Sequence, residues 1–276
     1  MKKIIAGGLL LLLFISARAQ TDSAEKRGPQ FKISANYNSN LNYYGRTDSL
    51  KSSGVFPMAE LWFSPEFYIN AAPIFINNAA QSFAYAGTVT TIGYQHITDH
   101  WLTSISLVKP FYQQNSQLVQ SALKAQASTS FSYLNKFLNL SVGGDVKFSD
   151  KVDYGASAGV DHIIRLPIGA NSVVVLDPSF YTYAGTQQFS KTYTKKKKGN
   201  LLFPGTEQQV SERVQQFNIL AYEVSLPVIV AKGKIQVVAT PSYVIPQNLL
   251  VVPGRPDLTE KGENTFYTTL GLKFTF

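Results

Sequence analysis

The chain has 276 residues, of which 45% are hydrophobic, and its formal net charge is +8. It contains no cysteine, which excludes disulfide bonds and thiolate metal sites. With 15 Tyr, 18 Phe and few acidic residues, its composition is typical of a large soluble β protein or of a transmembrane β-barrel, in which apolar residues are dispersed by alternation.

The first residues have the pattern of a secretory signal peptide. Two lysines precede an apolar run at 4–15, and an A-x-A cleavage site follows at 17–19. The run has 12 residues, fewer than the roughly 20 that a spanning helix needs, so an inner-membrane anchor is the weaker interpretation. We expect cleavage after residue 19, which would remove three basic residues and no acidic one and leave a charge of +5. A charge this modest does not indicate a nucleic-acid partner.

The mature chain divides into a short lead-in and one long domain. Residues 20–30 are polar and without periodicity, so we expect a flexible periplasmic lead-in. From 31 to 276, alternating apolar and polar residues predict twelve β-strands and almost no helix. The predicted strands span 31–44, 54–63, 66–77, 83–97, 101–112, 125–134, 137–148, 154–168, 172–195, 207–230, 234–245 and 265–276. The alternation is poor in the third and fourth strands, and their faces are left unassigned.

The connections between these strands alternate in length. Every second one is a tight turn of two or three residues, whereas the others are longer and reach 19 residues at 246–264. Outer-membrane barrels have short periplasmic turns and long extracellular loops. We therefore predict an all-β fold: a single 12-stranded, antiparallel, up-and-down transmembrane β-barrel at 31–276. The even number of strands places both termini in the periplasm. A secreted soluble β-sandwich is the alternative.

Two further features agree with a barrel. Hydrocarbon leaves no water for unpaired backbone groups, so the first and twelfth strands must pair with each other. Aromatic residues near the predicted strand ends, such as Trp62, Trp101 and Phe137, are typical of the girdles at membrane interfaces.

The closing stretch TFYTTLGLKFTF (265–276) alternates strictly and resembles the last strand of bacterial outer-membrane β-barrels. The resemblance implies that Phe274 and Phe276 belong to a C-terminal signal that the barrel-assembly machinery reads. It also implies a location in the bacterial outer membrane, with its lipids and lipopolysaccharide as partners. Stretches such as YEVSLPVIV and PSFYTYAGTQQF look like uncharacterised barrels of Bacteroidota. No substrate follows from the resemblance.

The predicted inward faces carry nine charged residues. They are Lys32, Glu60, Asp145, Lys147, Asp161, Arg165, Asp177, Glu223 and Lys273. Such charges either line a selective pore or pair with one another and plug the lumen. A 12-stranded barrel lies between the filled 8-stranded barrels and the open 16-stranded ones, so the strand number leaves both interpretations open.

Three histidines raise the alternative of a lipid-modifying enzyme. His96, His100 and His162 lie at predicted periplasmic strand ends, whereas barrel lipid hydrolases act from the outer leaflet. No nucleophile motif accompanies them, and the spacing of His96 and His100 suits a metal only on a helix. We therefore expect no enzyme, no cofactor and no catalytic or metal-binding residue.

A basic segment joins the two longest predicted strands. Its lysines are Lys191, Lys195, Lys196, Lys197 and Lys198. Beyond the membrane they would lie near lipopolysaccharide phosphates or anionic solutes, although the lysines are also consistent with a loop tip that is simply exposed to solvent.

The favoured function is a passive channel or small-solute transporter. The alternatives are a structural or surface-binding barrel with a plugged lumen and, less favoured, an outer-membrane enzyme.

Overall fold

The computed structural model describes residues 28–47, 51–80, 82–113, 123–196, 207–249 and 262–276. The predicted signal peptide and most of the lead-in lie outside these residues. The strands are β1 (Gln30–Asn38), β2 (Asn42–Tyr43), β3 (Arg46–Thr47), β4 (Ser53–Trp62), β5 (Phe67–Asn77), β6 (Ala84–Ile97), β7 (Trp101–Tyr112), β8 (Ala125–Tyr133), β9 (Asn139–Phe148), β10 (Val152–Asp161), β11 (Ile164–Gly169), β12 (Ser172–Leu176), β13 (Ser179–Lys196), β14 (Glu207–Ser225), β15 (Val228–Lys232), β16 (Ile235–Pro246) and β17 (Thr265–Thr275). The described part contains no helix long and apolar enough to cross a membrane.

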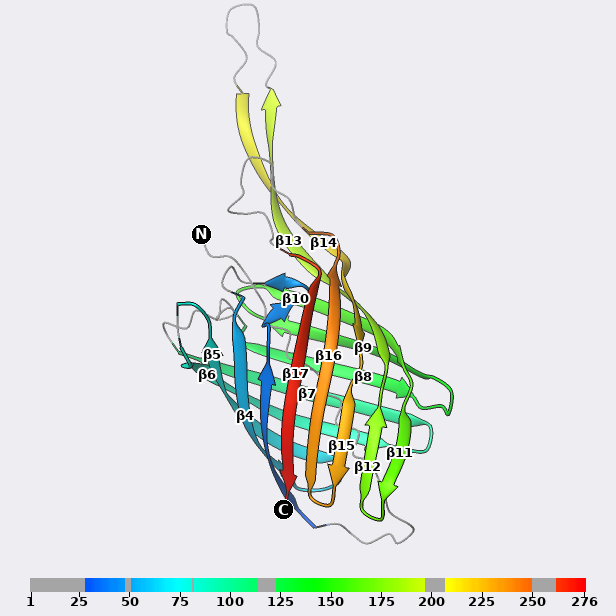
Figure 1. Ribbon diagram of the computed structural model, residues 1–276. Coiled ribbons are helices and arrows are strands. Elements are labelled where there is room, and N and C mark those ends of the chain that lie inside the picture. The colour runs from blue at the N-terminus through cyan, green and yellow to red at the C-terminus, as the bar shows by residue number, and fades with distance from the viewer. Residues whose placement is uncertain (1–27, 48–50, 81, 114–122, 197–206, 250–261) are drawn as a thin grey trace, which may run out of the picture.

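Fifteen of the strands form one closed antiparallel sheet (Figure 1). Three consecutive pairs, β10 with β11, β12 with β13 and β14 with β15, are halves of single wall strands, so the barrel has twelve strands, as predicted. Closure occurs between the first and last strands, with Lys32 opposite Thr275 and Asn38 opposite Thr269. The closed ladder leaves few backbone groups unpaired, which is the condition for a wall that faces hydrocarbon.

Two of the three interruptions occur at prolines, which cannot donate to the sheet ladder. Pro178 separates β12 from β13, and Pro227 separates β14 from β15. Backbone bonds bridge the interruptions, because His162 donates to Pro178 at 3.1 Å and Asp177 donates to Pro227 at 3.0 Å. The wall is therefore continuous across breaks that the alternation pattern did not indicate.

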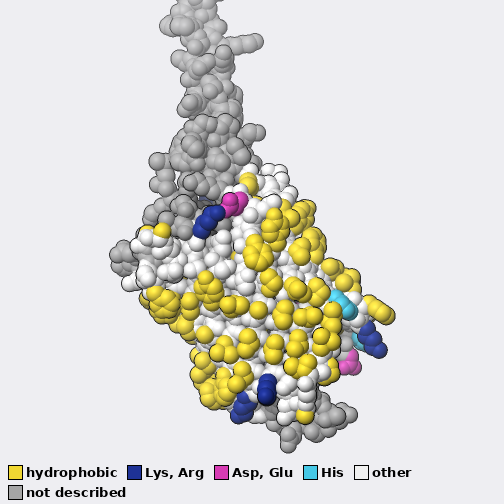
Figure 2. All heavy atoms as spheres, in the orientation of Figure 1, with side chains coloured by type: hydrophobic (Ala, Val, Ile, Leu, Met, Phe, Trp, Pro, Cys, Tyr) yellow, Lys and Arg dark blue, Asp and Glu magenta, His cyan; other side chains and the backbone are white. Residues whose placement is uncertain are grey.

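The outer face of the barrel is apolar. On β17, Phe266, Leu270 and Leu272 are exposed, whereas Tyr267 and Lys273 are buried. Hydrophobic side chains cover the wall as a broad band, and charged side chains lie toward its margins (Figure 2). Large exposed hydrophobic residues recur along nearly every wall strand. A soluble protein does not expose apolar surface on this scale, so lipid is the environment that this face requires.

The two ends of the barrel differ. The turn end carries the tight connections and Phe276, and the loop end carries the longer ones. The β13–β14 hairpin extends well beyond the loop end (Figure 1). Loop 1 follows β1, and its described residues are 39–47, 51 and 52; residues 42–47 form the small hairpin β2–β3. The first strand therefore ends at Asn38, whereas the alternation predicted a strand to residue 44.

The structure also assigns the faces of β5 and β6. Tyr68, Asn70 and Ile74 line the lumen, while Phe67 and Ile69 face outward. The pattern was weak because both faces are apolar near the loop end. Trp62, predicted as a girdle residue, is only 8% exposed and lines the lumen, so this prediction was wrong. It lies in phase with Glu60, two residues earlier on the same strand.

Candidate functional site: a cavity in the barrel lumen

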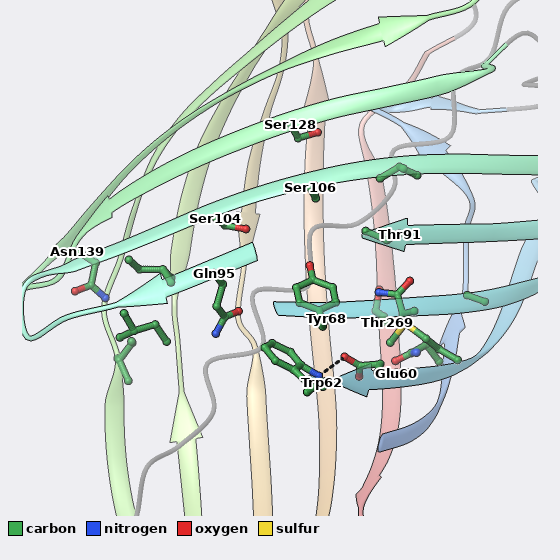
Figure 3. A pocket seen from close by; sticks show the side chains of 18 of the residues that line it. Glu60, Trp62, Tyr68, Thr91, Gln95, Ser104, Ser106, Ser128, Asn139 and Thr269 are labelled. Atoms are coloured by element: carbon green, nitrogen blue, oxygen red, sulfur yellow. Dashed lines mark hydrogen bonds between the residues drawn. The ribbon is translucent and has the colours of Figure 1, made fainter. Parts of the chain in front are cut away.

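The lumen contains a cavity of about 1110 Å³ (Figure 3). Its walls come mainly from the inner faces of β4 to β8, and residues 97–100 and 134–136 of two tight turns line its mouth at the turn end. The space exists because small side chains occupy many inward positions here, including Ser104, Ser106 and Ser128. Larger side chains at these positions would fill a barrel of this size.

The part of the cavity nearest the loop end is apolar. Ile74, Val89 and Val108 belong to one buried cluster, and Leu41 and Phe56 pack against it. We call these five residues the deep apolar zone. Leu41 comes from loop 1, so loop 1 supplies part of the cavity wall.

Toward the turn end the wall becomes polar but uncharged. Five side chains, which we call the neutral polar band, lie on adjacent strands: Asn70, Thr91, Gln95, Ser104 and Ser106. The register places Asn70 beside Thr91 and Gln95 beside Ser104. Across the described residues, none of these five side chains has a hydrogen-bond partner in the protein. They are therefore free to bond a solute in the cavity.

Two aromatic rings stand beside this band. Trp62 and Tyr68 stack with their ring centroids 4.6 Å apart. Tyr68 pairs with Gly93, and a Cβ atom at Gly93 would lie 2.1 Å from the Tyr68 ring. The glycine thus leaves the room that the ring occupies, and Figure 3 shows Tyr68 between Thr91 on one side and Gln95 and Ser104 on the other.

A charged cluster closes the same side of the cavity. Glu60 forms an ion pair with Lys273 at 2.8 Å and accepts a hydrogen bond from the Trp62 indole at 3.2 Å. Lys32 lies opposite Glu60 in the β1–β4 register, and its ammonium is 4.1 Å from the centre of the Trp62 ring. These charges are therefore compensated by one another and by the ring.

Loop 1 crosses the lumen at the loop end. Tyr43 of loop 1 and Lys147 of β9 line the same small pocket of the lumen, although β9 is six strands from β1 around the barrel. Tyr44 packs against Tyr183 with 4.9 Å between ring centroids. Burial raises the pKa of the Tyr44 hydroxyl well above its ordinary value, so the ring enters the lumen as a neutral group.

Arg46 fastens this loop to β14 and to the segment that follows β16. Its guanidinium donates to the carbonyl oxygens of Leu220 and Gln247, both at 3.0 Å, and to that of Tyr44 at 3.2 Å. Gly45 has a φ of 73° and packs against Pro246, where a side chain would clash. Arg46, Tyr43 and Tyr44 were missed by sequence reasoning, because a loop of Asn, Tyr and Gly gives no sign that it folds inward.

The nine predicted lumen charges are placed as follows. Lys32, Glu60, Asp161 and Lys273 are buried; Asp145, Lys147, Asp177 and Glu223 are half-buried; Arg165 is exposed at the mouth of the cavity. Besides the cluster at Glu60, Lys147 pairs with Asp145, Asn139 donates to Asp161 at 2.6 Å, and Tyr267 donates to Glu223 at 2.9 Å. The charges form separate small groups, and of the nine only Glu60 and Arg165 line the cavity.

The histidines do not converge. His96 bonds Glu66 at 2.8 Å, and His100 stacks on Tyr133 with 6.4 Å between ring centroids. Within the described ranges, no group of three or more His, Cys, Asp or Glu residues could hold a metal ion. The side chains of Lys191, Lys195 and Lys196 are not described, and Lys197 and Lys198 lie outside the described residues.

Comparison with known proteins finds distant structural likeness only. No protein-family model and no curated protein matches the chain. It is similar to the KdgM porin, with 8% identity, a TM-score of 0.44 and coverage of 89% of this chain and 99% of the porin. The chain is also similar to the COG4313 outer membrane channel from Pseudomonas putida F1, with 10% identity and a TM-score of 0.46. The match covers 93% of this chain and 100% of the channel. For LpxR from Salmonella typhimurium the identity is 8% and the TM-score is 0.43, and the match covers 89% of this chain and 100% of LpxR.

Proposed function

We propose that the protein is an outer-membrane channel for small solutes, closed at rest by loop 1. The observation that carries the proposal is the cavity of about 1110 Å³, which reaches the turn end and is bounded at the other end by loop 1. In this arrangement the turn end faces the periplasm and the loop end faces outward, as the sorted connections indicate.

The separate grouping of the lumen charges supports a channel over a plugged barrel. The Glu60–Lys273 pair lies against the wall strands, where it leaves the cavity unfilled. The only element crossing the lumen in the described part is loop 1, whose main polar attachment is Arg46. Hydrogen bonds from a charged group contribute about 1.5–3 kcal/mol each, so a loop held in this way can be displaced.

Single-channel recording in planar bilayers tests the proposal. We expect rare, small openings for the wild-type protein and larger, longer ones for Arg46→Ala, because the loop loses its bonds to the carbonyl oxygens of Leu220 and Gln247. Lys51→Ala is the matched control, since Lys51 is also a loop 1 cation but pairs with Glu263 at the surface. A barrel that inserts normally and stays silent both as Arg46→Ala and without residues 41–46 would contradict a channel function.

A further inference from the structure

We infer that the lumenal cavity binds a neutral glycoside, with its hydroxyl-rich ring at the neutral polar band and its apolar group in the deep apolar zone. The inference deepens the proposed function, because it names the class of solute.

The charge distribution selects a neutral solute. Glu60 lines the cavity but is already matched by Lys273 at 2.8 Å. The other charged residues that line it, Asp99, Lys136 and Arg165, are exposed at the mouth. Away from the mouth, the lining of this cavity therefore offers a charged ligand no unmatched opposite charge, and such a ligand would lose its hydration without compensation.

The neutral polar band selects a ligand with many hydroxyl groups. Its two amides and three hydroxyls can each donate and accept, and none of the five has a partner in the described protein. They come from three neighbouring strands, and Figure 3 shows Thr91, Gln95, Ser104 and Ser106 on either side of Tyr68. A pyranose ring carries hydroxyl groups along its rim that satisfy such a patch, whereas a ligand without them would leave these groups unpaired.

The deep apolar zone selects an apolar substituent on that ring. Val89 and Thr91 are inward neighbours on β6, and Val108 lies opposite Thr91 on β7, so the apolar zone directly adjoins the band. The cavity volume of about 1110 Å³ slightly exceeds the roughly 300–1000 Å³ found for small-ligand sites, which leaves room for both parts. Burying the apolar group adds affinity that a free sugar lacks.

Three probes test separately whether the ligand must be neutral and whether it needs an apolar group. The test measures binding to the protein in phospholipid nanodiscs by calorimetry, using phenyl β-D-glucopyranoside, its carboxylate counterpart phenyl β-D-glucuronide, and methyl β-D-glucopyranoside. We expect the phenyl glucoside to bind at least about tenfold more tightly than either of the others. Equal affinity for the glucuronide would overturn neutrality, and equal affinity for the methyl glucoside would overturn the role of the deep apolar zone.

Matched variants locate the site. Thr91→Val removes an inward hydroxyl at constant shape, and Thr90→Val makes the same change on the outward face of the same strand. We expect Thr91→Val together with Ser106→Ala to weaken phenyl glucoside binding by about fivefold or more, and Thr90→Val to leave it unchanged. Unchanged binding in the double variant would overturn the site.

Trp62 fluorescence gives an independent readout. Of the two tryptophans, Trp62 lines the cavity and Trp101 is exposed on the outer face, so Trp101→Phe leaves a single reporter in the cavity. We expect phenyl glucoside to change its emission, and no response at saturating ligand would contradict binding beside Tyr68. Binding without conductance would defeat only the channel, and conductance without binding would defeat only this inference.

Discussion

Lys273 of the last strand and Glu60 of β4 meet at 2.8 Å across the intervening strand β1. Both residues are buried, with 6% and 2% of their surface exposed. Lys32 of β1 adds a second buried ammonium opposite Glu60. The single carboxylate of Glu60 therefore lies beside two ammonium groups at the place where the barrel closes, and the balance of charge there depends on Glu60.

Replacing Glu60 is expected to weaken the barrel strongly. Glu60→Gln removes the negative charge beside two buried ammonium groups, and breaking a buried pair in this way costs about 3–5 kcal/mol. Lys273→Met should cost less, because Lys32 remains to balance Glu60. Urea unfolding in lipid vesicles measures the loss of stability in each of the two variants.

The exposed Lys51–Glu263 pair is the control, since Lys51→Ala should change stability by less than about 1 kcal/mol. A larger loss for Lys273→Met than for Glu60→Gln would refute this charge count.

Gly93 is expected to tolerate no side chain. A Cβ atom there would lie 2.1 Å from the Tyr68 ring, so Gly93→Ala should displace the ring and destabilise the barrel by about 1–3 kcal/mol. The Trp62 stack would also be disturbed, which a shift in tryptophan emission would report. Gly144→Ala is the control, because its nearest contact would be an ordinary 3.6 Å. Equal stability of the two variants would contradict the close approach of Tyr68.

The alternation of residues predicted the barrel wall well where the two faces differ in polarity. On β1, Lys32, Ser34 and Asn36 are buried between exposed neighbours, so period two is visible in the sequence. It failed on β5 and β6, because Ile74 and Val89 belong to an apolar zone inside the lumen. Polarity alone cannot separate lipid from an apolar cavity wall.

The contents of the lumen were much less predictable. The inward residues of β7, Ser104 and Ser106, are ordinary polar positions in the sequence, and their significance appears only when the register places them beside Gln95 and Gly93. Loop 1 depends on contacts with Leu220 and Gln247, some 170 to 200 residues away in the chain. No local pattern encodes a contact of that range.

Gly45 is expected to control the seating of loop 1. Gly45→Ala would require an L residue at φ 73° and would place a Cβ atom 2.8 Å from Pro246. The left-handed conformation alone costs about 1–2 kcal/mol, and the clash adds to it. We expect faster proteolysis within loop 1 and larger channel openings. Gly233→Ala carries a similar φ of 57° without a neighbour within 4 Å, so it should leave both readouts unchanged. Similar effects from both variants would indicate a general loss of stability.

Phe276 is expected to assist closure of the barrel. Its backbone N–H donates to Phe31 at 2.9 Å, and its ring lies 5.6 Å from that of Phe31 and 4.7 Å from that of Phe274. Deleting Phe276 removes a bond between the last and first strands together with an aromatic group at the turn end, so assembly into the membrane should slow. The folded, heat-modifiable fraction on a gel measures the rate of assembly in cells and in vesicles.

Phe266→Ala is the control, because it removes a similarly exposed outward ring at the loop end of β17 and should have a smaller effect. Normal assembly without Phe276 would show that closure does not depend on this contact, and a defect in cells alone would assign its role to recognition by the assembly machinery.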